Sequence, residues 1–298
     1  MTKAHPSPRR VALAGASGTI GSAVLRRLQV EGHHVAALPR GALTDADGLA
    51  DGFRDDRIEV VISCIASRSG APDDALAVDY GANARLLEAA LAAGVEHFIL
   101  LSAICVQKPR LAFQHAKLRF EAELAASGIG YTIIRPTAFF KSLSGQVKRV
   151  SAGKPFLIFG DGELTRCKPI SDDDLARFMC QCIDNPGAMG RILPIGGPGP
   201  AISLKEQGEL LFRLTGKPPR FAAISPKLFT FAERVLALGA PVSGWFAEKA
   251  EYARIARSYA AESMLVLDPD TGEYSAEHTP EFGSETLASH YRRLLAGV

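Results

Sequence analysis

The sequence lacks paired cysteines, metal-ligand spacings and any block of like charge. Its five cysteines are an odd, scattered set with no CxxC pair and no cysteine–histidine spacing suited to zinc or an iron–sulfur cluster: Cys64, Cys105, Cys167, Cys180 and Cys182. We interpret them as small apolar residues in a reducing compartment, and we predict no metal site. The net charge of +2 and the absence of a basic, aromatic-studded stripe argue against nucleic-acid binding.

Long hydrophobic runs and a signal peptide are also missing. The first residues, MTKAHPSPRR, are polar and contain no apolar signal-peptide core. The longest apolar runs are strand-sized, well short of the roughly 18 residues that cross a bilayer. We therefore expect a cytoplasmic protein with, at most, peripheral membrane contact. With 47% apolar and 22% charged residues over 298 positions, the chain suits a soluble enzyme with one large α/β domain or two unequal domains.

The first two-thirds of the chain alternate between β-branched runs and Ala/Leu-rich helical stretches. This pattern predicts strands at 10–15, 33–40, 58–66, 97–106 and 130–136, and helices at 19–32, 75–94 and 110–127. The strands are almost continuously hydrophobic, which is typical of a parallel sheet with helices on both faces. We predict an α/β fold built on a Rossmann-type doubly wound parallel sheet, with a smaller C-terminal substrate domain.

After Pro136 the alternation loosens. The sequence predicts a Ser-capped helix at 171–184, a strand that begins at 191 and enters a Pro/Gly loop, a Ser-capped helix at 203–216, a strand with a tight turn at 264–275, and a final helix after Ser284. We predict a nucleotide-binding domain over 9–198, with 137–170 contributing to the substrate cleft, and a substrate-binding or lid domain over 199–298. The aromatic-rich stretch 221–247 is either a membrane-leaning lid or an oligomer interface.

A glycine motif lies between the first predicted strand and the first predicted helix. In AGASGTIG, Gly15 permits a tight turn, Gly18 lets the backbone approach a pyrophosphate, and Gly21 lets the helix and strand pack closely. The phosphates then bind free N–H groups at the helix N-terminus, where the hydroxyls of Ser17 and Thr19 add donors. A dinucleotide site is the favoured interpretation, and a purely structural glycine turn is the alternative.

The end of the second predicted strand, AALPRG, indicates which dinucleotide is bound. It contains no acid for the ribose hydroxyls of NAD, but Arg40 suits a 2′-phosphate, so we favour NADPH over NADH. The alternative for Arg40 is a solvated loop cation. Ser67, after the third predicted strand, is a candidate contact for adenine or ribose, although a plain strand-end loop is equally compatible. Ser102, in the fourth predicted strand, is a further candidate for cofactor contact.

The stretch PRLAFQHAKLRFEAELAASG places Phe113 four residues before Lys117 on one helix face. This layout resembles the short-chain dehydrogenase/reductase superfamily in its atypical, isoflavone-reductase-like branch. In that resemblance Lys117 holds the nicotinamide ribose, and Phe113 occupies the position of the tyrosine that protonates a carbonyl oxygen. Because Phe113 cannot donate a proton, we predict reduction of a conjugated C=C bond, whose π-system disperses the negative charge. The alternative for Lys117 is a surface lysine.

The stretch YTIIRPTAFFKSL matches the superfamily segment that lines the nicotinamide. The resemblance places Pro136, Thr137, Ala138 and Phe139 beside the reactive ring. Alternatively, Phe139 and Phe140 are ordinary residues of the hydrophobic core and do not contact a ligand.

Longer strings, among them FQHAKLRFEAEL and GKPFLIFGDGELTRCKPISDDDLARF, resemble the divinyl chlorophyllide a 8-vinyl reductase family from about residue 9 to residue 290. The resemblance implies NADPH-dependent reduction of the 8-vinyl group of a magnesium tetrapyrrole to ethyl, in chlorophyll or bacteriochlorophyll biosynthesis. Phe139, Phe140 and Lys141 are candidate substrate contacts. Lys141, Lys148 or Arg149 could pair with the propionate, and the alternative for each is a solvated helix face. The magnesium arrives in the substrate. The sequence leaves open whether chlorophyllide or a less reduced precursor is preferred.

The proton donor is unassigned at this point. His115 and Tyr131 lie near the right segment, Lys117 is a third candidate, and water is the default. Two other functions stay open: a reductase of a smaller conjugated enone or quinone, and a non-catalytic NADP(H)-binding pigment carrier or assembly factor. The oligomeric state is open as well.

Overall fold

A six-stranded parallel sheet forms the centre of the molecule. The computed structural model describes residues 7–225 and 244–297. The sheet has the order β2-β1-β3-β4-β5-β8, and its strands are β1 (Arg10–Ala14), β2 (His34–Leu38), β3 (Val60–Ser63), β4 (His97–Leu101), β5 (Gly130–Pro136) and β8 (Arg191–Ile195). Every neighbouring pair runs parallel, which confirms the doubly wound sheet.

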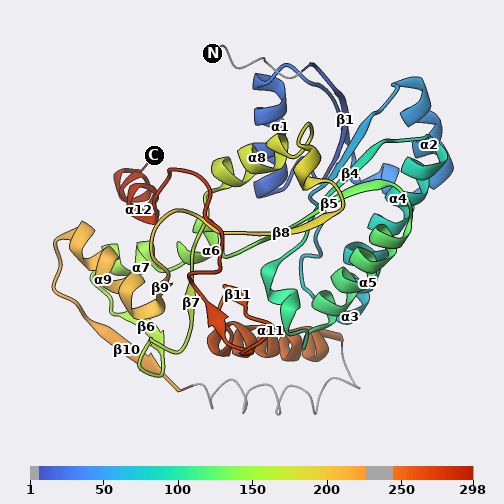
Figure 1. Ribbon diagram of the computed structural model, residues 1–298. Helices are drawn as coiled ribbons and strands as arrows, with labels where there is room; N and C mark the ends of the chain where they lie inside the picture. Colours follow the sequence, from blue (N-terminus) through green and yellow to red (C-terminus); the bar gives the residue numbers. More distant parts are fainter. Residues whose placement is uncertain (1–6, 226–243, 298) are drawn as a thin grey trace.

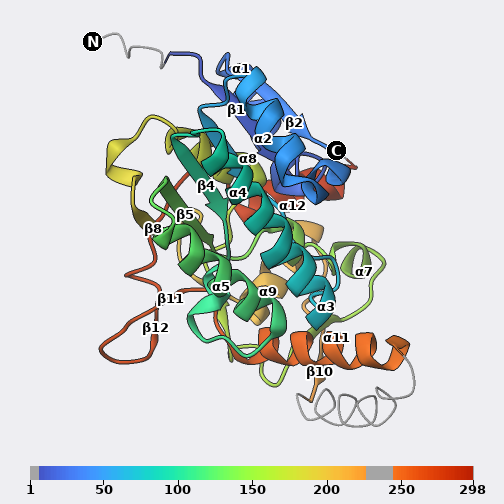
Figure 2. The same cartoon turned by 90° about the vertical axis from the view of Figure 1, so that its right-hand side faces the viewer.

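Helices cover both faces of this sheet (Figures 1 and 2). The helices α1 (Thr19–Val30) and α8 (Asp172–Gln181) pack together on one face, and α2 (Ala46–Asp55), α4 (Asn83–Ala92) and α5 (Ala112–Ala126) cover the other. Alternate residues of a strand point to opposite faces. In β1, Val11 and Leu13 therefore enter the core shared with α1 and α8, while Ala12 and Ala14 enter the core shared with α2, α4 and α5.

Two segments differ from their predicted form. The single helix predicted over 75–94 is a short α3 (Pro72–Asp74), a π-helix η2 (Ala75–Ala82) and α4. The strand predicted over 97–106 ends at Leu101, and the chain continues as the 3₁₀-helix η3 (Ile104–Gln107). Ile104 and Val106 in η3 are buried and therefore apolar. The apolar run of the sequence thus continues past the end of β4, and periodicity alone does not separate a longer strand from a strand followed by a buried helical turn. The helix α2, which Asp45 caps, and the 3₁₀-helix η1 (Arg40–Thr44) before it were not predicted.

Besides the cores on the two faces of the sheet, a separate core, here called the second core, joins the segment after β5 to the C-terminal third. It includes Phe140, Phe156, Phe212, Leu287 and Tyr291. The elements around it are α6 (Phe140–Leu143), α7 (Val147–Ser151), α9 (Leu204–Thr215), α12 (Leu287–Ala296), and β6 (Phe156–Phe159) paired in parallel with β10 (Phe221–Ile224). Residues 140–158 thus share a core with residues beyond 199, while the domain boundary at 198 stays a prediction.

The helices α8 and α9 both begin with a side-chain cap, as predicted. Ser171 caps α8 by accepting from the N–H of Asp174, and Ser203 forms a capping box with Glu206 at the start of α9. Short strands complete the region: β7 (Arg166–Cys167) pairs with β9 (Ile202–Ser203), and β11 (Val266–Leu267) pairs with β12 (Tyr274–Ser275), both antiparallel. The β11–β12 pair confirms the predicted strand with a turn. A 3₁₀-helix η4 (Pro186–Ala188) precedes β8.

A long helix, α11 (Gly244–Ala261), runs along one end of the molecule, below α5 and β11 in Figure 1. Most of the aromatic stretch predicted as a lid or interface, 226–243, lies outside the described residues. Among the helices that the structure does describe, none is both long enough and apolar enough to cross a membrane.

Candidate active site

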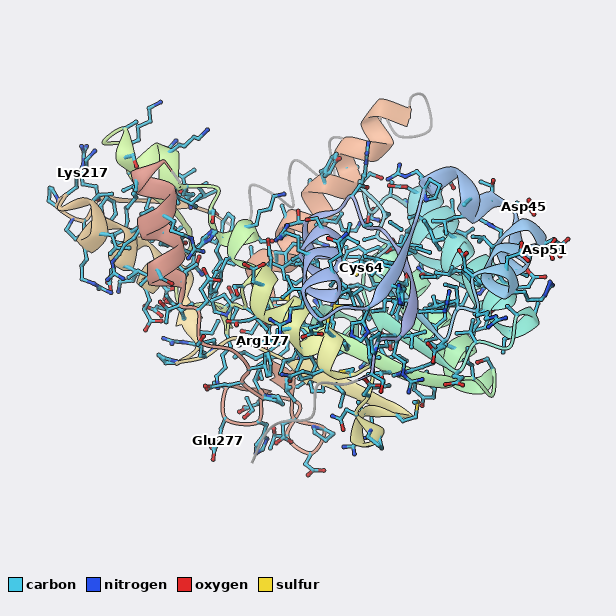
Figure 3. The ribbon with its side chains drawn as sticks, turned by 90° about the horizontal axis from the view of Figure 1, so that it is seen from above. Asp45, Asp51, Cys64, Arg177, Lys217 and Glu277 are labelled. Atoms are coloured by element: carbon cyan, nitrogen blue, oxygen red, sulfur yellow. The ribbon has the colours of Figure 1, made fainter. Side chains whose placement is uncertain are left out.

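A cavity of about 700 Å³ opens at the carboxyl ends of β3, β4 and β5. Ligands of open parallel sheets bind at this edge, where the strand order reverses. In Figure 3, Cys64, which follows β3 and lines the cavity, lies in the middle of the molecule. Lys217, just after α9, is at one end, and Asp45 and Asp51 are at the other. The cavity lies between the sheet and the second core, because Leu143, Phe156 and Leu204 of that core also line it.

Many of the predicted site residues line this one cavity, although they come from four separate segments. They are Ser67, Ser102, Phe113, Lys117, Pro136, Thr137, Ala138 and Phe139. The end of β5 and the loops after β3, β4 and β5 supply all of them except Phe113 and Lys117, which α5 presents one turn apart.

Two positions of the glycine loop, Gly15 and Gly21, have no room for a side chain. Gly15 has φ +83°, and a Cβ on it would lie 2.7 Å from the carbonyl oxygen of Cys64. A Cβ on Gly21 would lie 2.0 Å from the carbonyl oxygen of Gly15. The N–H of Gly18 donates to the carbonyl of Gly15 at 2.9 Å, and Gly18 forms the N-cap of α1. Ser17 and Gly18 are exposed, so the loop and the first turn of α1 fit a pyrophosphate.

Lys141 reaches this glycine loop. Its Nζ donates to Oγ1 of Thr19 at 2.7 Å, and it does not line the cavity. The structure therefore places the Lys141 ammonium beside the glycine loop, and its predicted substrate contact stays a prediction. Lys148 is exposed on α7, and Nε of Arg149 donates to the carbonyl of Pro155 at 2.7 Å. Neither lines the cavity either.

The neighbouring phenylalanines Phe139 and Phe140 take different positions. Phe139 lines the cavity. Phe140 is only 2% exposed and packs in the second core, with its ring centroid 5.3 Å from that of His290. The predicted substrate contact of Phe140 is therefore wrong, and its alternative as plain core is correct. The extended backbone of Phe139 directs the two side chains apart.

Arg40 begins η1 directly after β2, and β2 pairs with β1, which carries the glycine loop. Arg40 is exposed. The pKa of Asp74 is lowered mainly by a hydrogen bond from the N–H of Ser69, and the charge of Arg40 lowers it further. Arg40 therefore lies near the loop that follows β3, at the sheet edge where a bound nucleotide would lie.

Lys117 forms an ion pair that the sequence did not reveal. Its Nζ lies 2.9 Å from Oδ1 of Asp79, and the side chains of Lys117 and Asp79 are 11% and 1% exposed. Asp79 lies in the π-helix η2 and also lines the cavity. The alternative of a surface position for Lys117 is therefore wrong.

A second ion pair lies behind the cavity wall. Glu121, which is 3% exposed, contacts the guanidinium of Arg135. It also accepts a hydrogen bond from Oγ of Ser102. The hydroxyl of Ser102 is thus directed toward Glu121, although Ser102 still contributes to the cavity lining.

The cysteines of the cavity are not nucleophiles. Three cysteines line it, and burial raises the pKa of Cys64 and of Cys167 to about 12 and also raises the pKa of Cys105, so all three are thiols at neutral pH. All five cysteines are free, and Cys167, Cys180 and Cys182 are buried, as predicted for small apolar residues.

Of the other proton-donor candidates, His115 is exposed on α5 and Tyr131 packs against the sheet core. Neither lines the cavity. Phenol groups reach the cavity from elsewhere: α11 presents Tyr252 and Tyr259 on the same helix face as Ile255.

Comparisons with known proteins show the family to which this chain belongs. Residues 40–186 match a family of NAD(P)H-binding proteins. The chain is 47% identical to the chloroplastic divinyl chlorophyllide a 8-vinyl-reductase of Oryza sativa subsp. indica, over 97% of this chain and 79% of that protein. It is 44% identical to the corresponding protein of Cucumis sativus, over 98% of this chain and 77% of that protein. The chain belongs to the divinyl chlorophyllide a 8-vinyl-reductase family. The resemblance stated from the sequence is confirmed.

A solved structure supports the fold of this family member. An NADPH-dependent quinone oxidoreductase from Escherichia coli, in complex with NADPH, superimposes with a TM-score of 0.66 and 19% identity. The match covers 96% of this chain and 99% of that one. At this identity the likeness shows the fold alone.

For this reductase-family chain, sequence reasoning missed two groups of site residues. Asp79 lies in a segment that looks like an ordinary Ala/Leu-rich helix, and no sequence signal marks the π-helical turn that directs it inward. The face of α11 is separated from α5 by more than a hundred residues, so only the tertiary fold brings Tyr252 and Tyr259 to the cavity.

Proposed function

We propose that this protein uses NADPH to reduce the 8-vinyl group of divinyl chlorophyllide a, or of a close magnesium-tetrapyrrole precursor, to ethyl. The observation that carries the proposal is 47% identity to a divinyl chlorophyllide a 8-vinyl-reductase over 97% of the chain. The chemistry of the cavity agrees with it, because Phe113 provides no acid for a carbonyl oxygen where Lys117 is retained.

The residues at the sheet edge fit NADPH. The backbone N–H groups of the glycine loop and the first turn of α1, together with Lys141, are positioned to hold the pyrophosphate. Arg40 is the residue for the 2′-phosphate, and Lys117 for the nicotinamide ribose. When bound, NADPH supplies the hydride.

The cavity suits a flat, conjugated pigment. Its volume of about 700 Å³ lies within the range typical of pockets for organic ligands. Aliphatic and aromatic side chains line it on both sides: Ile65 and Phe139 on the sheet side, and Phe156, Ile202 and Ile255 on the other. These residues bind the macrocycle through apolar contact and exclude water from the reacting bond.

Mass analysis of the pigment tests this function. Purified protein is incubated with NADPH and divinyl chlorophyllide a, and the pigment is extracted. A gain of two hydrogens at one vinyl group is the expected result. Unchanged pigment with no NADPH oxidation would favour a carrier, and faster turnover of a small enone or quinone would favour a different reductase.

A further inference from the structure

The ion pair between Lys117 and Asp79 has features that ribose binding alone does not require. Asp79 is almost fully buried, yet it forms part of the cavity wall. Its Oδ1 lies 2.9 Å from Nζ of Lys117 and also accepts from the N–H of Ser67 at 3.4 Å. Its Oδ2 is buried and has no hydrogen-bond partner among the residues that the structure describes. Leaving a buried carboxylate oxygen without a partner costs free energy, so this oxygen calls for an explanation beyond a structural ion pair.

The backbone that carries Asp79 is also unusual. Residues Ala75–Ala82 form a π-helix, which is rare and occurs frequently at functional sites. The side-chain amide of Asn83 donates to the carbonyl of Asp79 at 3.0 Å, and Oγ of Ser63 contacts the same amide group at 2.5 Å. These buried contacts tie the π-helix to the end of β3 and fix Asp79 opposite α5.

The ammonium of Lys117 has more N–H donors than its ion pair with Asp79 uses. A lysine ammonium carries three N–H donors, and the pair with Asp79 uses one of them. The remaining donors lie on a side chain that lines the cavity. One of them suffices for a ribose hydroxyl, which leaves another for the substrate.

The reaction needs such a donor. Phe113 has no acidic proton, and His115 and Tyr131 do not line the cavity. Tyr252 and Tyr259 line it from α11, and burial raises the pKa of Tyr259, which makes that phenol a weaker acid.

Lys117 lies on α5, on the side of the sheet edge where the cofactor is expected. We propose that Lys117 is the acid that protonates the reduced vinyl group, and that Asp79 is the positioning residue that holds its ammonium in the cavity. This inference rests on the proposed function and assigns the proton that the function requires.

The step balances as follows. Bound NADPH would supply the hydride by breaking its C4–H bond and would be oxidised to NADP⁺. The hydride forms a C–H bond at the terminal vinyl carbon and leaves an electron pair on the inner carbon, conjugated with the macrocycle. That pair takes a proton from Lys117 Nζ, which forms the second C–H bond and breaks the N–H bond. Water then returns a proton to the neutral amine through the open side of the cavity.

Other groups contribute to the field around this pair. On the side of η3, Cys105 interacts with the charges of Lys117 and Arg135. Further along the same face of α5, Glu121 is engaged by Arg135 and Ser102. The loop after β3 adds Arg68, and the region of α11 adds Tyr252, Tyr259 and Glu262. Asp79 is the carboxylate in contact with Lys117.

The test uses Lys117→Arg, which keeps a cation and hydrogen-bond donors but does not release a proton at working pH. We expect NADPH to bind with a dissociation constant within about threefold of wild type, measured by cofactor fluorescence, because the ribose contact survives. We expect turnover to fall about 100-fold or more, the usual contribution of a general acid. Lys148→Arg, the same change at an exposed position on α7, should alter neither value.

Asp79→Asn tests the positioning role. Removing the negative charge disfavours the ammonium, so the alkaline limb of the pH–turnover profile should move to lower pH by about one unit or more. Asp73→Asn, at an exposed position on α3, should leave the profile unchanged. Thermal unfolding of each variant confirms that it folds.

The outcomes separate this inference from the proposed function. If wild type does not reduce the vinyl group, the proposed function fails. If wild type does, and Lys117→Arg turns over within threefold of it, Lys117 is not the acid. If Lys117→Arg loses NADPH binding in parallel with turnover, Lys117 serves the cofactor alone and the inference is overturned. An unchanged profile in Asp79→Asn removes Asp79 from its role.

Discussion

Gly21→Ala is the sharpest test of the glycine loop as the pyrophosphate site. The added Cβ would lie 2.0 Å from the carbonyl oxygen of Gly15 and 2.7 Å from its carbonyl carbon. An ordinary contact needs roughly 3.5 Å, so the turn at Gly15 and the start of α1 must separate by about 1.5 Å. Both neighbours are backbone atoms, so no flexible side chain can absorb the shift.

The displacement should weaken NADPH binding by about 30- to 1,000-fold. It moves N–H groups of the loop out of reach of the pyrophosphate, and each hydrogen bond to a charged group contributes about 1.5–3 kcal/mol. Losing one or two of them gives a loss of that size. The strain should also lower the free energy of unfolding by about 1–3 kcal/mol.

Fluorescence titration with NADPH and urea unfolding measure the two effects. Gly52→Ala is the matched control: a Cβ there meets nothing within 4 Å, and the residue lies inside α2, where alanine is favoured over glycine. It should bind NADPH normally and be equally or more stable. If Gly21→Ala folds and its dissociation constant stays within twofold of wild type, the glycine loop is not the pyrophosphate site.

Three further changes test single residues of the site. Arg40→Ala should raise the KM for NADPH about tenfold and that for NADH far less, because only NADPH carries the 2′-phosphate; an equal effect on both would remove Arg40 from that site. Phe113→Tyr should not improve vinyl reduction, since no oxyanion forms beside it, and a large gain in kcat would contradict the account of the missing acid. Lys141→Ala should raise the KM for NADPH several-fold and leave the KM for pigment unchanged, with Lys148→Ala as the control; the reverse pattern would support Lys141 as a substrate contact.

The sequence was sufficient to predict the fold and the cofactor edge because both follow from local patterns. The alternation of apolar strands and amphipathic helices, and three glycines at fixed spacing, determine the parallel sheet and the turn between β1 and α1. The same reasoning placed Phe113, Lys117 and the segment Pro136–Phe139 in one cavity, since each follows a strand or lies on one face of α5.

The remainder of the site depends on tertiary structure. The π-helical turn that directs Asp79 inward leaves no trace in helical periodicity, and the face of α11 meets the cavity only after the chain has folded back on the sheet. The sequence did not show that Phe140 enters a core while Lys141 reaches the glycine loop, because neighbouring residues of a short segment diverge. Local sequence does not fix such directions.

Transfer of label from the cofactor tests the central claim most directly. The protein is given divinyl chlorophyllide a and NADPH that carries deuterium on the transferred face of nicotinamide C4, and the product is analysed by mass spectrometry and NMR. The account predicts one deuterium on the terminal carbon of the new ethyl group. An ethyl product without deuterium, or pigment that stays divinyl while bound beside the cofactor, would contradict it.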